Sequence, residues 1–184
     1  MRVSREQMVQ NRGRILDEAS RLFQARGFDA VSVVEVMKAA GLTHGGFYGH
    51  FSSKDDLIAQ SVAHAMAKDA GGEGDMHAYL QAYLSENHRD NAASGCPTAG
   101  LAADIRHQTV AARRAMTEGL QSQIDRLSAA LSGNGATDMR RAAIGNWAAM
   151  VGAMILARAI DDPVFSNEIL EQTRKWIDVK IDLP

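Results

Sequence analysis

Residues 43–54 hold the densest group of side chains that could contact a ligand. The hydrogen-bonding and small members are Thr43, His44, Gly45, Gly46, Tyr48, Gly49 and His50, and Lys54 adds a positive charge. A glycine inside a helix costs about 1 kcal/mol relative to alanine, so glycines in so short a helix are unfavourable for stability alone. Close approach of the backbone to another molecule would account for them. Tyrosine, histidine and lysine groups can hydrogen-bond phosphates, which set the position of a protein on DNA.

The residues around this group predict the elements that position it. Ser32 and Glu35 have the spacing of a capping box, which begins a helix near residue 32. Gly41 breaks that helix, and Thr43 is expected to cap a second, very short helix over residues 43–50. Phe47 and Phe51 are four residues apart and would anchor the second helix to the first. A helix, a tight turn and a second helix form a helix-turn-helix, whose second helix fits a major groove about 12 Å wide.

The rest of the chain has the pattern of an all-α protein with about nine helices. Further helices are expected over residues 5–26, 53–70, around 79–84, from 97, through 116–131, over 137–160 and from 163. Residues 70–75 have the composition of a linker, and 86–95 that of a polar loop. The sequence predicts a helix-turn-helix DNA-binding domain at 1–52. A helical bundle for effector binding and dimerisation follows at 53–184, with 53–70 as the connecting helix.

Composition and charge restrict the class of protein. The formal net charge is -2, so a DNA site must be a local basic patch. Its candidate is the N-terminal arm with Arg2, Arg5, Arg12 and Arg14, although a solvated charge cluster explains these residues equally well. No run of about 18 apolar residues and no signal peptide is apparent, which predicts no membrane span and a cytoplasmic protein. One cysteine excludes an intrachain disulfide.

A longer series of residues extends the helix-turn-helix pattern in one order. It comprises Ile15-Leu16-Asp17-Glu18-Ala19, Leu22-Phe23, Gly27-Phe28, Ser32-Val33, Ala39-Ala40-Gly41-Leu42-Thr43, Phe47-Tyr48-Gly49-His50-Phe51 and Ser53-Lys54-Asp55-Asp56-Leu57. This series, about a quarter of the chain, resembles the TetR family of bacterial regulators. The resemblance implies a homodimer that places two recognition helices in successive major grooves of a palindromic operator. It also implies repression that a small effector relieves.

The resemblance further implies roles for single residues. His44 and Gly45 would face base edges with Gly49 beside them. The residues that would hold phosphates are Ser32, Thr43, Tyr48, His50 and Lys54. Gly49 departs from the family, because many members carry a larger, base-contacting side chain there. The last two helices would pair with those of a partner, and small residues that permit close approach are Gly145, Ala149, Gly152 and Ala153.

Cys96 lies in the sequence Gly95-Cys96-Pro97, where proline begins a helix and the thiol stands at its N-terminus. Such a position favours the thiolate, and His88 and Arg89 could add positive charge. One hypothesis is therefore a regulator that senses oxidants or electrophiles through Cys96. The alternative is a small buried hydrophobic residue, which is the usual environment of a free cysteine.

Large apolar and amphipathic side chains in the second half could line an effector pocket. The candidates are Tyr79, Tyr83, Cys96, Met116, Trp147, Met150 and Met154. Ordinary packing in the core or at a dimer interface explains each of them equally well. If they do form a pocket, its methionines favour a hydrophobic or aromatic effector.

Metal, cofactor and enzyme functions find little support. The spacings of His64, His77, His88 and His107 match no compact set of metal ligands. Glycine-rich phosphate loops and serine-hydrolase motifs are missing. Cys96 with His88 or His107 could in principle form a nucleophile and base, yet nothing in the sequence supplies a third group. We expect neither an enzyme nor a cofactor, and a protein-binding module without DNA contact is the remaining alternative.

Overall fold

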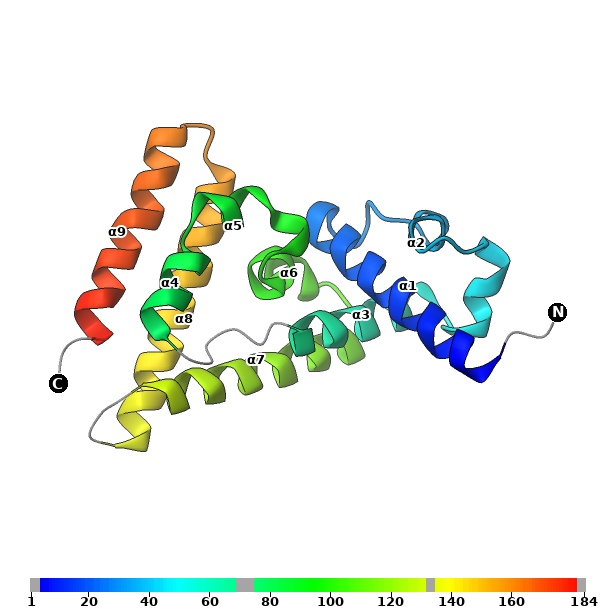
Figure 1. The fold of residues 1–184 in the computed structure, drawn as a ribbon, viewed down its shortest axis with the longest axis horizontal. Coiled ribbons are helices and arrows are strands. Elements are labelled where there is room, and N and C mark those ends of the chain that lie inside the picture. Colours follow the sequence, from blue (N-terminus) through cyan, green and yellow to red (C-terminus); the bar gives the residue numbers. More distant parts are fainter. Residues whose placement is uncertain (1–3, 69–74, 132–134, 182–184) are drawn as a thin grey trace.

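A computed structural model describes residues 4–68, 75–131 and 135–181 (Figure 1). Every regular element in these ranges is helical, as the sequence predicted. The elements are α1 (Arg5–Arg26), α2 (Val33–Ala39), η1 (His44–Gly49), α3 (Lys54–Lys68), α4 (Met76–Tyr83), α5 (Glu86–Asp90), η2 (Ala92–Ser94), α6 (Pro97–Ile105), α7 (Val110–Ala130), α8 (Ala136–Ala159) and α9 (Pro163–Ile181). Figure 1 shows α1 and α2 at one end of the molecule, α8 and α9 side by side at the other, and α7 running between them.

Local signals set the N-terminal helix boundaries. The Ser4 hydroxyl accepts a hydrogen bond from the Gln7 N–H at 3.1 Å and caps α1. Gly27 follows α1 with φ 77°, and Gly41 follows α2 with φ 69°, a region that glycine adopts readily. The Ser32–Glu35 capping box is present in full. The end of α1 before Gly27, the break at Gly41 and the capping box are as the sequence predicted, whereas the Ser4 cap was not predicted.

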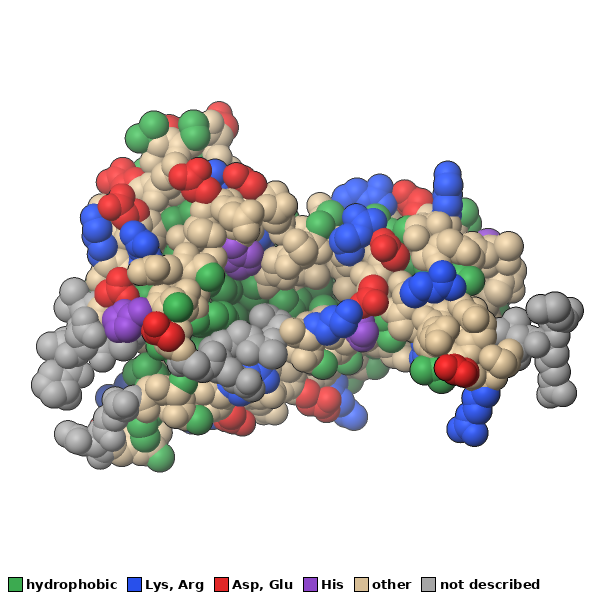
Figure 2. Space-filling model, in the orientation of Figure 1, with side chains coloured by type: hydrophobic (Ala, Val, Ile, Leu, Met, Phe, Trp, Pro, Cys, Tyr) green, Lys and Arg blue, Asp and Glu red, His purple; other side chains and the backbone are tan. Residues whose placement is uncertain are grey.

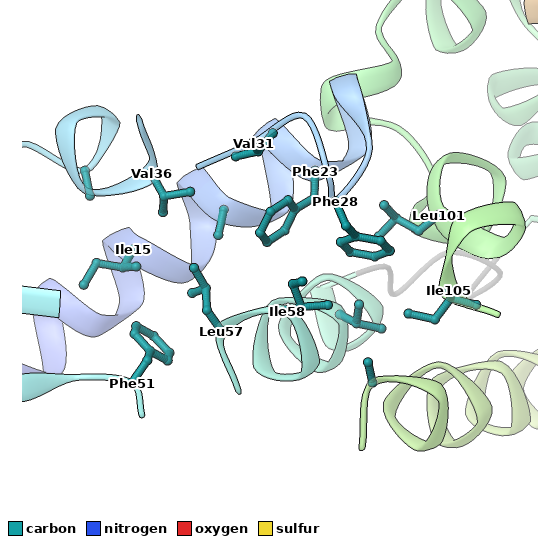
Figure 3. Close-up of a cluster of buried hydrophobic side chains, with 14 of the residues drawn as sticks. Ile15, Phe23, Phe28, Val31, Val36, Phe51, Leu57, Ile58, Leu101 and Ile105 are labelled. Carbon is teal, nitrogen blue, oxygen red and sulfur yellow. The ribbon is translucent and has the colours of Figure 1, made fainter. Parts of the chain in front are cut away.

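The first hydrophobic core joins the N-terminal helices to α3, α6 and α7. In Figure 3, Leu101 and Ile105 of α6 lie beside Phe28, which follows α1. Phe23 and Phe28 pack with their ring centroids 5.3 Å apart, as expected for a residue that folds back onto α1. The apolar residues of α3 belong to this same core. The boundary at residue 52 therefore crosses continuous packing, and the division into two domains stays a prediction.

The second hydrophobic core is formed by α4, α7, α8 and α9, together with Cys96. The two cores meet along α3 and α7, which approach each other closely at Gly119. A Cβ atom on Gly119 would lie 2.5 Å from the Cβ of Met66, so no larger residue fits without a shift of the helix. This contact holds the connecting helix α3 against the C-terminal part of the chain.

Two local predictions were wrong. Residues 86–95 form α5 and η2 in place of a polar loop, because the Ser85 hydroxyl accepts from the His88 N–H at 3.2 Å and begins a short helix. The Thr43 side chain makes no capping hydrogen bond, and the element after it is a 3-10 helix. Other predicted features lie outside the described residues: Arg2, the linker residues 70–74, and residues 133 and 134.

One described helix, α8, is long and apolar enough to cross a membrane by length and composition. This corrects the expectation that the chain contains no such segment. The observation is weak, because the core helix of a globular protein passes the same test. Here α8 supplies Trp147, Met150 and Met154 to the second core, although only 33% of its apolar window is buried.

Candidate functional site

The helix η1 has a buried side and an exposed side. Phe47 and Phe51 are buried, and their stacked rings have centroids 5.7 Å apart, as the sequence predicted. Tyr48, next to Phe47, is 72% exposed. Also exposed are Ser32, Thr43, His44, Gly45, Gly46 and Gly49, while His50 and Lys54 are half-buried. The aromatic pair therefore fixes η1 on the core and leaves its polar residues on the molecular surface.

Nothing within the described chain requires glycine at the three η1 positions. None of them has a positive φ. A Cβ on Gly45 would meet nothing within 4 Å, and one on Gly46 or Gly49 would lie 3.8 Å from Met37 Cε or 4.0 Å from Met8 Cε. Alanine would fit at each and would favour a helix. The glycines leave the backbone of η1 uncovered by side chains, and the described fold gives no steric reason for them.

Arg12, one of the four arginines of the predicted basic arm, makes its contacts within this unit. The guanidinium donates hydrogen bonds to the carbonyl oxygen of His50 and to Oε1 of Gln60. It also lies 4.4 Å from the centroid of the Phe51 ring. Arg12 therefore connects α1 to η1 and α3. Arg5 and Arg14 of the arm are exposed, as is Lys38 of α2.

His50 can contact a phosphate as a neutral donor. Burial lowers the pKa of its imidazole, and the Arg12 guanidinium lowers it further. The charged form is thus disfavoured at neutral pH. Of the residues predicted to contact phosphates, Lys54, at the start of α3, is the one that carries a positive charge.

Ser32 is engaged inside the chain. Its hydroxyl donates to Oε2 of Glu35 at 2.9 Å and accepts from the Glu35 N–H at 3.2 Å. The Ser32 N–H also donates to Glu35 Oε2 at 2.8 Å, and Arg26 lies 3.0 Å from Oε1. These bonds keep the start of α2 in place. A phosphate contact through the Ser32 hydroxyl hydrogen would require its bond to Glu35 to break.

The capping box makes a prediction about pH. Hydrogen bonds from Ser32, and then from Arg26, lower the pKa of Glu35 from 4.5 to about 2. A carboxyl group with a lowered pKa in the folded state stabilises the fold above its unfolded pKa, and this stabilisation is lost as pH falls from about 4.5 towards 2.

Glu35→Gln should therefore be less stable than wild type at neutral pH, and the difference in stability should shrink below about pH 4. Urea unfolding at several pH values measures this. Glu118→Gln, exposed on α7, is the matched control, and an equal pH profile for both variants would contradict the prediction.

A cavity of about 490 Å³ lies between α1 and α3 on one side and α4, α5, η2 and the start of α6 on the other. Figure 2 looks into a hollow in this region, with hydrophobic side chains on its floor. Of the predicted effector residues, Tyr79, Tyr83 and Cys96 border the cavity. Met116 packs in the first core. Trp147, Met150 and Met154 pack in the second core, and neither they nor Met116 border this cavity.

Cys96 is buried at the N-cap of α6. Its N–H donates to Nε2 of His88 at 2.9 Å, and Nδ1 of His88 lies 2.7 Å from the carbonyl oxygen of Tyr83. Since Nε2 accepts, the ring hydrogen of His88 is assigned to Nδ1, where it is donated to Tyr83. His88 therefore positions the backbone at Cys96, and Nε2 takes no proton from the thiol while this bond persists.

Two residues around Cys96 carried no signal in the sequence. A Cβ on Gly95 would lie 2.7 Å from Cδ2 and Nε2 of His88, so the ring requires glycine there. Arg158 of α8 donates to the carbonyl oxygens of His88 at 2.8 Å and Arg89 at 3.1 Å. Burial lowers the pKa of the Arg158 guanidinium, and Tyr83 and Cys96 nearby raise it. Only folding brings Arg158 to residue 96.

The histidines considered as metal ligands have other partners in the structure. His64 contacts Asp17 at 2.7 Å, and His77 contacts Asp178 at 3.1 Å. His107 Nε2 accepts from Arg106 at 2.9 Å, beyond the end of α6. Within the part of the chain that the structure describes, no three histidine, cysteine or acidic side chains gather in a way that could hold a metal ion.

The outer face of α8 and α9 is apolar and grooved. A depression of about 540 Å³ is bordered by small residues of α8, by Leu156, and by Ile169 and Trp176 of α9. Leu156 is 55% exposed and Trp176 is 52% exposed. Among the small residues predicted for this face, Gly145 is exposed and a Cβ there, or at Gly152, would meet nothing within 4 Å. Ala149 and Gly152 are half-buried, and Ala153 is buried beneath the groove.

Comparison with known proteins identifies the fold and the family. A family profile described as bacterial regulatory proteins, tetR family, matches residues 15–60. The HTH-type transcriptional repressor NemR of Escherichia coli (strain K12) is 30% identical over 132 residues, which is 65% of this chain and 66% of NemR. The crystal structure of reduced E. coli NemR superposes with a TM-score of 0.76 at 25% identity, covering 95% of this chain and 98% of NemR. The chain belongs to the TetR family.

Two further TetR-family matches show where the likeness is concentrated. The HTH-type transcriptional regulator AcrR of Shigella flexneri is 41% identical over 59 residues, or 32% of this chain and 27% of AcrR. A TetR-family regulator from Cytophaga hutchinsonii has a TM-score of 0.76 at 20% identity and is covered completely, which shows a shared fold. The chain thus spans about a quarter of AcrR and just under two thirds of NemR in sequence. The part of the chain that matches most strongly is the helix-turn-helix region of TetR-family transcriptional regulators.

Proposed function

We propose that the protein is a repressor that binds a palindromic operator as a homodimer and is released by a small effector. The observation that carries the proposal is the two-sided character of η1. Phe47 and Phe51 bury one side, while His44, Gly45 and Tyr48 occupy an open, low surface. Such a helix can enter a major groove with its backbone close to the bases. Repression is supported by the name of NemR, which is described as a transcriptional repressor. A protein that binds operator DNA in a bacterium acts in the cytoplasm.

In this proposal the residues divide by their contacts. His44 and Gly45 face base edges with Gly49 beside them. Gly49 has no side chain to contact a base, unlike the larger residue of many family members. Tyr48, His50 and Lys54 hold phosphates. Gly46 is also exposed, and its lack of a side chain lets the η1 backbone come closer to the DNA. Base contacts carry sequence preference, and phosphate contacts carry affinity that falls with salt.

Gly45→Ala tests the close approach. The variant should fold with unchanged or slightly higher stability, because the new methyl group has space and alanine is the better helix former. Its affinity for DNA flanking its own gene should nevertheless fall by about tenfold or more, through a clash with the groove. Gel shifts and urea unfolding measure the two effects. Ala111→Gly on the exposed face of α7 is the control, and undiminished DNA affinity of Gly45→Ala would contradict the geometry.

The salt dependence of the gel shift tests DNA binding itself. Affinity should fall steeply between about 50 and 200 mM salt, because each neutralised phosphate releases counterions. Lys54→Ala should weaken all sequences alike and reduce the salt slope, whereas His44→Ala should relax the sequence preference. If the protein does not shift the DNA that flanks its own gene even at low salt, DNA binding is contradicted and a protein-binding module is the remaining alternative.

A second candidate function is thiol sensing. Cys96 borders the cavity at the N-cap of α6, and Arg158 is close enough to act on it electrostatically. A helix N-terminus and a nearby guanidinium are features of reactive cysteines, whereas the burial of Cys96 opposes ionisation of its thiol. A structure of NemR is described as its reduced form, which makes the same chemistry worth testing in this chain.

Cys96→Ser tests the sensor. Hydrogen peroxide or iodoacetamide should release the wild-type protein from DNA, and the variant should stay bound. The chain has a single cysteine, so a thiol reagent can act at one residue. Gel shifts before and after treatment measure release, with labelled-thiol stoichiometry as the control for reaction. Equal release of both proteins would assign the effect to another group.

A further inference from the structure

We propose that Gly119 sets the separation of the two reading heads in the dimer, because it fixes how closely α3 approaches α7. The reading head is defined here as α1, α2, η1 and α3. The proposal rests on the proposed function and deepens it, since the separation of the heads decides which spacing of half-sites a dimer can bind. Gly119 lies in α7, outside the head, and is a positioning residue that acts through Met66 of α3.

The glycine at residue 119 is explained by its neighbour and by nothing in its own helix. Gly119 lies in the interior of α7, where alanine would be the better helix former. Its φ is not positive, so the backbone conformation does not require glycine. A Cβ at this position would lie 2.5 Å from Cβ, 2.7 Å from Cγ and 2.8 Å from Cε of Met66. Carbon atoms in favourable contact are about 3.5–4.0 Å apart, so the two helices approach more closely here than any side chain at residue 119 allows.

The closest contact involves the backbone of α3 and not only a flexible side chain. Rotation of the Met66 side chain could move Cγ and Cε, but Cβ moves only with the backbone. Met66 is also confined, because it is 4% exposed and the Thr98 hydroxyl of α6 donates to its sulfur at 3.9 Å. A methyl group at residue 119 should therefore push α3 away from α7 by about 1 Å at Met66.

The helix α3 is bonded to α1, so the two helices should move together. The Ser20 hydroxyl donates to the carbonyl oxygen of Ser61 at 3.0 Å, and both residues are buried. Further along, Nε2 of His64 lies 2.7 Å from Oδ1 of Asp17. The side chains of α1 and α3 meet in the first core (Figure 3), which also contains residues of α2 and η1. A displacement of α3 is therefore a displacement of the reading head.

The expected displacement is large enough to matter on DNA. Ile58 and Ala112, in the first half of α3 and of α7, belong to the first core. Ile58 is eight residues before Met66, which is about 12 Å along the axis of α3. With Ile58 held in this core, a shift of about 1 Å at Met66 tilts α3 by about 5° and moves the other end of the head by about 1–2 Å. Both heads of the dimer change, so their separation changes by about 2–4 Å, against 3.4 Å between successive bases of a strand.

Gly119→Ala tests whether the head moves. Crystal structures of the full-length variant and wild type in the same crystal form, superposed on α8 and α9, should show α3 displaced from α7 by about 1 Å at Met66, with α1 displaced alongside it. Gly135→Ala is the matched control, because a Cβ there would meet nothing within 4 Å, and its head should stay in place. A head that keeps its wild-type position in Gly119→Ala overturns the proposal.

Operators of altered spacing test the consequence for DNA binding. Footprinting of the DNA that flanks the gene gives the parent operator, and one base pair is then added or removed at its centre. Wild type should bind the parent at least about tenfold more tightly than either altered operator. In Gly119→Ala the half-site sequence should be unchanged, while the ratio of affinities for the three operators should change by about fivefold or more. Gly135→Ala should keep the wild-type ratio. An affinity of Gly119→Ala that falls equally for all three operators would indicate a general loss of structure and overturns the proposal.

Met66→Ala separates the effect of the helix from that of the methionine side chain. The double variant Gly119→Ala/Met66→Ala loses the conflict with Cγ and Cε and keeps the conflict between the two Cβ atoms. Its altered ratio should therefore remain, whereas Met66→Ala alone should keep the wild-type ratio. The double variant is less overpacked and carries the test if Gly119→Ala does not fold. A wild-type ratio in the double variant overturns the proposal.

The structural and DNA measurements separate this proposal from the proposed function. A displaced head in a protein that shifts no DNA keeps the positioning role of Gly119 and overturns the proposed function. Operator binding with the same ratio in wild type and Gly119→Ala keeps the function and overturns the proposal. A displaced head together with a changed ratio supports both.

Discussion

Alanine in place of Phe47 should lower the free energy of unfolding by about 3–5 kcal/mol, the range for removing a buried aromatic ring. Phe47 is 1% exposed and stacks on Phe51, so truncation leaves a hole between η1 and α2. Urea unfolding followed by circular dichroism measures the loss. DNA binding should disappear with it, because η1 loses the contact that orients it.

Tyr48→Ala is the matched control for this prediction. Tyr48 is the next residue and is 72% exposed, so its removal should cost less than about 1 kcal/mol, part of it the edge contact with Phe47. Its DNA affinity should still fall about fivefold, similarly for all sequences, through loss of one phosphate contact. The opposite ranking of the two variants in stability would mean that η1 is turned the other way, and the proposed interface would be wrong.

Glutamate in place of Leu156 should convert the protein from a dimer to a monomer. In the proposed twofold dimer this residue occurs twice in one apolar interface, so two unpaired carboxylates would be buried. Each costs several kcal/mol when it has no partner, enough to weaken association by a factor of about 100 or more. Sedimentation velocity at micromolar concentration measures the change in mass.

Operator affinity should fall with the dimer. Two linked reading heads gain about 10²–10⁴ over one, because the second binds at a high effective concentration. Val110→Glu is the control, since Val110 is an apolar residue of α7, 63% exposed, away from the α8–α9 groove. A Leu156→Glu protein that stays dimeric would remove this face as the interface, whereas dissociation of both variants would show only that added charge disrupts association.

Local patterns were predicted well where short-range chemistry decides them. Ser32 and Glu35 are three residues apart and form their hydrogen bonds within one turn, so the start of α2 could be predicted without the rest of the fold. Gly27 and Gly41 follow the helices they end for the same reason. By contrast, the helix at α5 depends on a weak cap at Ser85 in a polar segment, and composition alone favoured a loop.

The role of Arg12 within the fold could not be predicted, because its partners are far away in the sequence. A basic residue in a basic arm has the pattern of a phosphate contact, yet its guanidinium bonds to His50 and Gln60 and covers Phe51. The same limit applies to Met116, Trp147, Met150 and Met154. An apolar side chain suits a pocket wall and a packed core equally well, and which of the two it forms depends on the helices that cover it.

By itself, the sequence determined the longer helices, the turn at Gly41 and the glycine-rich segment that follows it, since capping, helix propensity and hydrophobic spacing act over a few residues. Only the tertiary structure decided that Gln24 and Ala93 face one cavity, that Gly95 makes room for His88, and that Arg158 lies beside Cys96. These contacts join residues that are close only after α1, α6 and α8 have packed. Their distances follow from the arrangement of the helices, which no local pattern in the chain encodes.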